Sequence, residues 1–169
     1  MAGKGEVLTV ERLRAVLDYD PASGVFRWRV DTGKKRLAGT VAGCSTKTGH
    51  AVIGIDGRLY LAHRLAWMWV NGQWPAEEID HRNGDPSDNR ITNLREASHA
   101  QNMRNSSIRS HNTTGFKGVH FYKRTGAWTA KVTAGGRQHF LGYFRSAQDA
   151  HAAYVAAAVR VHGEFHRVR

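Results

Sequence analysis

The chain has 169 residues, which allows one ordinary domain or two small ones. Its net charge of +11 and pI near 10.4 indicate a polyanionic partner, most simply nucleic acid. The single cysteine, Cys44, excludes an intrachain disulfide and a zinc site of the CxxC type. The N-terminal MAGKGEVLTV lacks the apolar stretch of a signal peptide, and no apolar run reaches membrane-spanning length. We therefore expect a cytoplasmic, intracellular protein with no membrane partner.

The first elements predicted along the chain are a helix, a turn and a strand. Periodic apolar residues predict a short helix over residues 12–17, with Thr9 near its start. The segment YDPASG at residues 19–24 predicts a turn, and the alternating VFRWR at residues 25–29 predicts a strand. Residues 31–48 are polar and contain several glycines, which predicts an exposed loop.

A hairpin and a buried helix are predicted next. The runs HAVIGI at residues 50–55 and RLYL at residues 58–61 flank Asp56-Gly57, a dipeptide that suits the type I′ turn of a tight hairpin. The segment AHRLAWMWV at residues 62–70 is apolar on most sides. It predicts a buried helix that ends at Asn71-Gly72.

The most informative segment spans residues 79–105 and reads IDHRNGDPSDNRITNLREASHAQNMRN. A strand is predicted to end at His81, and the dense cluster of turn residues from Asn83 to Asn89 predicts a loop. A short strand is expected to return over residues 91–94, followed by a helix over residues 98–105. A hairpin with a long loop, packed against a helix, would bring side chains from all three elements into one site.

Four side chains of this segment have the chemistry of a small metal-dependent phosphodiesterase site. Asp80 and Asn102 supply a carboxylate and an amide oxygen, which are hard ligands suited to Mg²⁺ or Mn²⁺. His81 can act as a base near neutral pH. Asn93 follows twelve residues after His81. Two other asparagines are alternatives: Asn89 could take the place of Asn93, and Asn105 could take the place of Asn102.

The segment resembles the HNH (ββα-metal) endonuclease motif of the phage and homing type, in which the third motif residue is Asn. The resemblance implies that His81 is the general base, that Asp80 and Asn102 hold one Mg²⁺ or Mn²⁺ ion, and that Asn93 fixes the loop and orients His81. It also implies hydrolysis of DNA to 5′-phosphate and 3′-hydroxyl ends. No zinc is expected, because the four-cysteine zinc of many relatives cannot form with one cysteine. A His-Arg pair also occurs upstream in relatives; here we expect His63 to be structural and Arg64 to be available for a phosphate contact.

Charge and composition change after Asn105. Residues 106–169 carry 10 Lys+Arg against 2 Asp+Glu, a net of +8, whereas residues 1–105 carry 15 against 12, a net of +3. The polar residues 106–114 predict a linker. Three strands are then predicted at residues 118–122, 128–132 and 138–144, and an alanine-rich helix follows from a capping-box variant at Ser146 to Gly163.

Residues 115–163 resemble the plant ethylene-response-factor (AP-two type) DNA-binding domain. The resemblance lies in the aromatic-basic-Gly-Val start, the strand around Trp128 and the LGYF of residues 141–144. It implies a three-stranded antiparallel sheet on one helix, with the exposed sheet face in the DNA major groove. Strand alternation and the flanking turns place the DNA contacts at Lys117, His120, Tyr122, Arg124, Lys131, Thr133, Arg137, Gln138 and Phe140. Several of these positions usually hold Arg in that family, so the target sequence stays open.

The sequence thus predicts an α+β protein with a ββα-metal HNH domain over residues 6–105, a linker over residues 106–114, and a sheet-type DNA-binding domain over residues 115–169. The predicted function is a metal-dependent DNA endonuclease that acts on double-stranded DNA as a monomer or weak dimer. The alternative is a non-catalytic DNA-binding regulatory protein on a decayed HNH scaffold. The intact set of Asp80, His81, Asn93 and Asn102 argues against decay.

Overall fold

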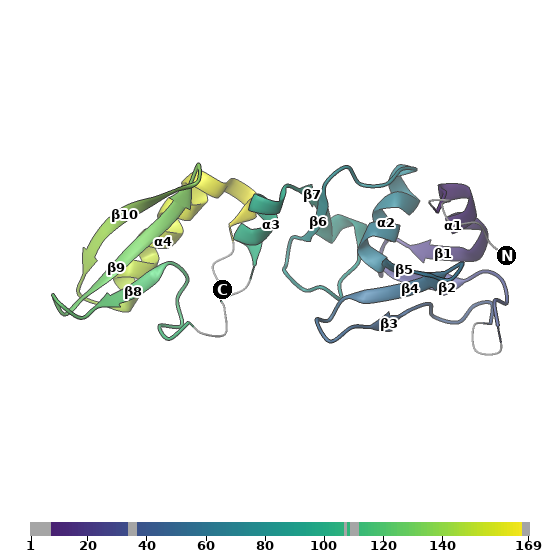
Figure 1. Ribbon diagram of the computed structural model, residues 1–169, viewed down its shortest axis with the longest axis horizontal. Helices are drawn as coiled ribbons and strands as arrows, with labels where there is room; N and C mark the ends of the chain where they lie inside the picture. Colours follow the sequence, from purple (N-terminus) through teal and green to yellow (C-terminus); the bar gives the residue numbers. More distant parts are fainter. Residues whose placement is uncertain (1–7, 34–36, 107, 109–111, 167–169) are drawn as a thin grey trace. The chain divides into compact units, whose positions relative to one another are not determined.

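The computed structural model describes residues 8–33, 37–106, 108 and 112–166 (Figure 1). It has a mixed α/β fold, with four α-helices and several small antiparallel sheets in these residues. Two compact units make up the chain, one up to His99 and one from Ala100. The helix over residues 99–105, which we assigned to the first domain, therefore groups almost entirely with the second unit. Part of the predicted linker, at residues 107 and 109–111, lies outside the described residues, and the domain assignment stays a prediction.

The first unit begins with a helix and a hairpin. Helix α1 (Val10–Val16) is capped by Thr9, whose hydroxyl accepts a hydrogen bond from the backbone N–H of Arg12. Strand β1 (Leu17–Asp20) then pairs with β2 (Val25–Trp28). The prediction of a turn from residue 19 was wrong in its extent. The residues of β1 alternate between buried and exposed, so Tyr19 belongs to a strand and the turn is confined to residues 21–24.

A three-stranded sheet follows, in the order β3-β4-β5, from β3 (Cys44–Ser45), β4 (Ala51–Ile55) and β5 (Arg58–Leu61). The predicted hairpin is confirmed: Asp56 and Gly57 have φ of 49° and 78°, as a type I′ turn requires. The expected loop over residues 31–48 instead contributes β3 to this sheet. Helix α2 (Ala62–Asn71) ends at Gly72 in the left-handed conformation, as predicted.

The last hairpin of the first unit is formed by β6 (Glu78–His81) and β7 (Leu94–Ala97). Residues 91–93, expected as the start of the returning strand, form a short 3-10 helix, in which the N–H of Leu94 bonds to the carbonyl of Ile91. The strand therefore starts three residues later than predicted. This shift decides the register, which pairs Asp80 with Arg95 and His81 with Leu94. Helix α3 (His99–Asn105) follows.

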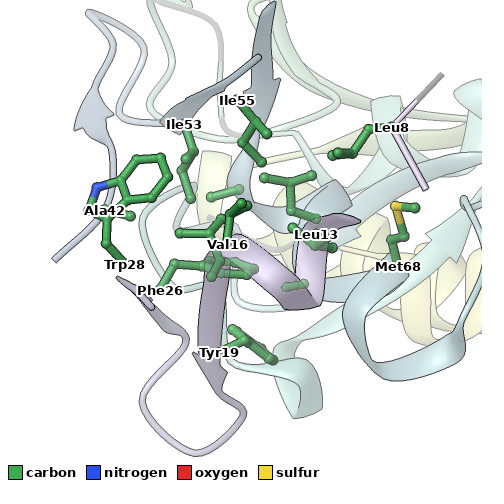
Figure 2. Packing of buried hydrophobic residues seen from close by; sticks show 14 of the residues in the cluster. Leu8, Leu13, Val16, Tyr19, Phe26, Trp28, Ala42, Ile53, Ile55 and Met68 are labelled. Atoms are coloured by element: carbon green, nitrogen blue, oxygen red, sulfur yellow. The ribbon is translucent and has the colours of Figure 1, made fainter. Parts of the chain in front are cut away.

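One hydrophobic core joins these elements (Figure 2). Leu13 and Val16 of α1 lie next to β1, β2 and the inner face of the β3-β4-β5 sheet. Leu65 of α2 is fully buried in the same cluster. Burial of these side chains gives the short strands, which would be marginal alone, a common surface to pack on. The core therefore fixes α2 and β4 relative to the β6–β7 hairpin.

In the second unit, β8 (Val119–Tyr122), β9 (Ala127–Ala134) and β10 (Arg137–Phe144) form an antiparallel sheet in the order β10-β9-β8. Helix α4 (Ala147–His162) covers one face of this sheet (Figure 1). Ser146 caps α4 as predicted, because its hydroxyl accepts the N–H of Asp149. The same hydroxyl donates to the carboxylate of Asp149. A β-bulge lies between Phe140 and Gly142. Within the described residues, no helix combines the length and apolar character needed to cross a membrane.

Candidate active site

His81 occupies the last position of β6 and its side chain is buried, with 6% of its surface exposed. Its Nε2 lies 3.3 Å from Oδ1 of Asn89, in the loop that connects β6 to β7. The N–H of Gly84 bonds to the carbonyl of His81 and starts the turn that follows. The imidazole is thus held by contacts from its own loop.

Asn93 ties the two ends of this loop together. Its Oδ1 accepts the N–H of Asn83 at 3.0 Å, and its Nδ2 donates to Oδ1 of Asn83 and to the carbonyl of Asp88. Its own carbonyl accepts the N–H of Arg82, the residue after His81. Asn93 makes these contacts through its side chain and backbone at once, so it sets the path of the chain on both sides of the loop.

The loop is also held from outside, by the β1–β2 hairpin. The hydroxyl of Tyr19 donates to the carbonyl of Asn89 at 2.7 Å. Gly24, with φ of +74°, allows a close approach, because a Cβ there would lie 2.5 Å from the backbone N of Arg90. Since Asn89 contacts His81, the hairpin and the core beneath it help to position the imidazole.

Two further histidines approach His81. His63 lies on α2 and its ring centroid is 5.0 Å from that of His81; His50, just before β4, lies 5.5 Å from His63 and 6.0 Å from His81. The nitrogen atoms that these residues offer all lie within 4.8 Å of one another. His63 is 5% exposed, and its Nδ1 has no hydrogen-bond partner. We call this set the histidine cluster.

Burial controls the protonation of the cluster. It lowers the pKa of His63 to about 3, and the neighbouring His81 and His50 act in the same direction. Burial also lowers the pKa of His81, although the hydrogen bond with Asn89 opposes this. Both imidazoles are therefore neutral at neutral pH, the form that can accept a proton or bind a metal ion.

Asp80 forms a buried ion pair with Arg95 on the neighbouring strand. The Nε and Nη2 atoms of Arg95 both lie 2.8 Å from Oδ2 of Asp80, and the two side chains are 4–5% exposed. Because Asp80 and His81 are consecutive in a strand, their side chains leave its opposite faces. A cation that binds Asp80 must share the carboxylate with Arg95 or displace it.

The remaining residues named from the sequence lie on α3 and on α2. Asn102 is half-buried on α3 and Asn105, its rival, is buried there. Both belong to the second unit, and Asn102 as a metal ligand stays a prediction. His99 is exposed and bonds Glu78 at 2.8 Å. Arg64 donates to the carbonyl of Glu77 and lies over the ring of Trp74.

The exposed face of the β8–β9–β10 sheet carries most of the predicted DNA contacts. Cross-strand pairs put Lys131 beside Phe140 and Thr133 beside Gln138. The residues on or bordering this face that are exposed are His120, Tyr122, Arg124, Lys131, Thr133, Arg137, Gln138 and Phe140. The ammonium of Lys117 instead bonds the carbonyls of Arg104 and Ser106, so Lys117 is engaged at the end of α3.

Tyr143 joins this face because of the β-bulge. It pairs with Thr129, three residues along β10 from Phe140, whereas strict alternation would have turned it toward α4. The ring centroids of Phe140 and Tyr143 are 5.1 Å apart, and those of Tyr122 and Tyr143 are 6.2 Å apart. Together with Arg124, whose guanidinium lies over Tyr122, these rings form an exposed aromatic cluster.

Residues 60–104 match the HNH endonuclease family. Over 110 residues, the chain is 34% identical to Protein 3.8 of Escherichia phage T7, an alignment that covers 63% of this chain and 88% of that protein. The chain belongs to the family of that phage protein and carries an HNH endonuclease domain. The HNH match runs from β5 to α3, so it contains His63 but leaves out His50. No solved structure matches the chain.

Three residues around Asp80 and His81 were missed or misplaced from the sequence. His50 is 31 residues from His81 in a polar turn, where no spacing pattern marks it. Asn89 was named only as a rival of Asn93 within the turn-rich loop, yet it contacts His81. Arg95 would have been found from Asp80 only with the correct strand register, which the 3-10 helix shifts.

Proposed function

We propose that this protein is a divalent-metal-dependent DNA endonuclease, in which the HNH domain hydrolyses phosphodiester bonds and the second unit anchors the duplex. The observation that carries the proposal is the buried and oriented imidazole of His81, which lies within the segment that matches the HNH endonuclease family. The resemblance implies 5′-phosphate and 3′-hydroxyl ends. Because its T7 relative is a phage protein, we place the reaction in a phage-infected bacterial cell.

In this proposal His81 is the general base. It accepts a proton from the water that attacks the phosphorus, which requires a neutral imidazole with one acceptor nitrogen. The lowered pKa of His81 keeps the ring in that form at neutral pH. Asn89 restrains the ring, and Asn93 holds the loop that carries Asn89. Asn93 is therefore a positioning residue.

The proposed metal ligands are Asp80 and Asn102, which offer the hard oxygen donors preferred by one Mg²⁺ or Mn²⁺ ion. Such an ion, when bound, stabilises the charge that develops on the phosphate and on the leaving 3′-oxygen. Arg95 fixes the position of the Asp80 carboxylate through the 2.8 Å contacts. Asp80 and Arg95 are thus expected to act as a unit.

The proposed DNA anchor is the exposed face of the β8–β9–β10 sheet. The chain has no Asp or Glu between Glu96 and Asp149, so this sheet carries only positive charge. Basic residues next to exposed rings can neutralise phosphates and contact bases in a groove. The same arrangement would serve a non-catalytic DNA-binding protein, so the nuclease assignment rests on His81.

Cleavage of supercoiled plasmid in Mg²⁺ tests the nuclease. We expect the wild type to nick or linearise the plasmid and EDTA to stop it. His81→Ala should lower the rate about 10²–10⁴-fold while DNA binding persists. The matched control is His99→Ala, which removes an exposed imidazole and should retain the rate. Wild-type turnover by His81→Ala would refute the base assignment. A wild type that binds DNA but never cuts it, with Mg²⁺ or Mn²⁺, would favour the regulatory protein.

A salt titration of DNA binding tests the anchor in the full-length chain. Lys131→Gln removes a charge from the exposed sheet face, whereas the control Arg160→Gln removes one from the exposed side of α4. If Lys131 contacts a phosphate, the slope of log K against log salt should fall by about 0.9 in the first variant only. Equal slopes for the two variants would place the DNA elsewhere.

A further inference from the structure

The histidine cluster has a chemistry that the proposed Mg²⁺ reaction does not use. A hard, strongly hydrated ion prefers oxygen ligands, whereas three imidazoles favour a borderline ion such as Zn²⁺. The three imidazoles come from different elements: His50 from a turn, His63 from a helix and His81 from a strand. Only the tertiary fold brings them together. Such a site needs no cysteine, so the presence of a single cysteine does not exclude it.

The geometry of the cluster is close to that of a metal site. Zn–N bonds are about 2.0–2.1 Å, so the nitrogens of a tetrahedral site lie roughly 3.4 Å apart. The three available nitrogens already lie within 4.8 Å of one another, so a shift of about 1 Å or less per ring closes the site.

The surroundings of His50 and His63 suit metal ligands. Metal-bound histidines usually hold a partner on their second ring nitrogen, and Nδ1 of His50 lies 3.1 Å from the hydroxyl of Thr48. His63 carries a buried nitrogen with no partner, which costs free energy unless something binds it. Gly49 keeps His50 near the site, because a Cβ at Gly49 would lie 2.9 Å from Cγ of Pro86 in the β6–β7 loop.

We propose that His50, His63 and His81 form a binding site for one Zn²⁺ or similar borderline transition-metal ion, and that its occupation switches the nuclease off. The inhibitory part rests on the proposed function. A neutral imidazole has a single acceptor nitrogen. His81 therefore cannot bind zinc through that nitrogen and take a proton from water with it. Zinc and the general-base reaction compete for the same lone pair.

Metal binding is tested without DNA, on untagged full-length protein. Calorimetry with Zn²⁺ should give one equivalent of tight binding, and Co²⁺ should give the visible d–d absorption of a low-symmetry nitrogen site. His50→Ala should weaken zinc binding at least about 100-fold, since even the loss of a ligand's outer partner costs 10–100-fold. His50→Gln provides a second variant that keeps a side chain in the turn. The control His99→Ala removes an exposed histidine beside Glu78 and should change nothing. Zinc affinity that is unaffected by both His50 variants, or lost only in the His99 control, would overturn the site.

Inhibition is tested by adding Zn²⁺ to the plasmid assay at constant Mg²⁺. The wild type should lose activity at the zinc concentrations that saturate the site. His50→Ala should cut in Mg²⁺ and should need at least a tenfold higher zinc concentration for the same inhibition. Stimulation by zinc, or equal inhibition of wild type and His50→Ala, would overturn the inhibitory role. If the protein never cleaves DNA, the nuclease proposal fails, while the calorimetry still decides the metal site.

Discussion

Breaking the ion pair between Asp80 and Arg95 is expected to destabilise the first unit severely. Arg95→Met leaves the Asp80 carboxylate without its guanidinium, and Asp80→Asn leaves the guanidinium without its charge partner. With side chains only 4–5% exposed, neither remaining charge can recover its hydration. Removal of one partner of such a pair costs about 3–5 kcal/mol. That is a large part of the 5–15 kcal/mol by which a domain is typically stable.

The double variant distinguishes lost pairing from lost packing. Asp80→Asn with Arg95→Met removes both charges, so it should lose less stability than the two single losses added together. Coupling energies of residues in direct contact are about 0.5–3 kcal/mol. The exposed pair of Arg12 and Asp56 is the matched control, because its contact is also 2.8 Å but its side chains are 51–54% exposed. Arg12→Met should cost less than about 1 kcal/mol.

Urea unfolding followed by tryptophan fluorescence measures these losses. In a Trp128→Phe background, which removes one of the five tryptophans, the other four all report on the first unit. A loss of 3–5 kcal/mol should lower the urea midpoint by about 2 M. The reasoning is refuted if Arg95→Met costs no more than Arg12→Met, or if the double variant loses the full sum of the single losses.

Three further outcomes are expected. In EDTA, the free energy of unfolding should fall by about 2 kcal/mol between pH 7 and pH 5, because His63 is protonated below about pH 6.5 in the unfolded chain, whereas burial holds its folded pKa at about 3. The stability contributed by this group is complete above pH 6.5 and is lost toward pH 3. Urea titration measures the fall, and an equal fall in His63→Leu would contradict the assignment. Gly118→Ala should lower the melting temperature of the second unit, measured by circular dichroism, more than Gly126→Ala does. Both glycines have positive φ, but only a Cβ at Gly118 would meet Tyr154, at 2.3 Å. Equal losses would count against that contact. Tyr143→Ala should weaken duplex binding in a gel-shift titration by about 1 kcal/mol or more, as loss of a stacking ring does, whereas Val159→Ala on α4 should not.

Local patterns in the sequence were enough to predict the individual elements. The Asp56-Gly57 hairpin, α2 with its end at Gly72, and the Ser146 cap of α4 each depend on backbone conformations that nearby residues favour. The same holds for the placing of His81 at a strand end beside a turn-rich loop. The family match over residues 60–104 confirms the prediction of an HNH motif. The sequence could reveal this motif because it lies within one contiguous segment.

The partners of each side chain depended on contacts between distant segments. The 3-10 helix before Leu94 shifted the strand register and gave Asp80 its pairing with Arg95. A single bulge turned Tyr143 to the exposed face of its sheet. His50 reaches His63 and His81 only because the core packs the β3–β4 turn and α2 against the loop. Strand register and packing are set by the apolar surface buried over the whole unit. The spacing of residues within one segment does not determine that burial.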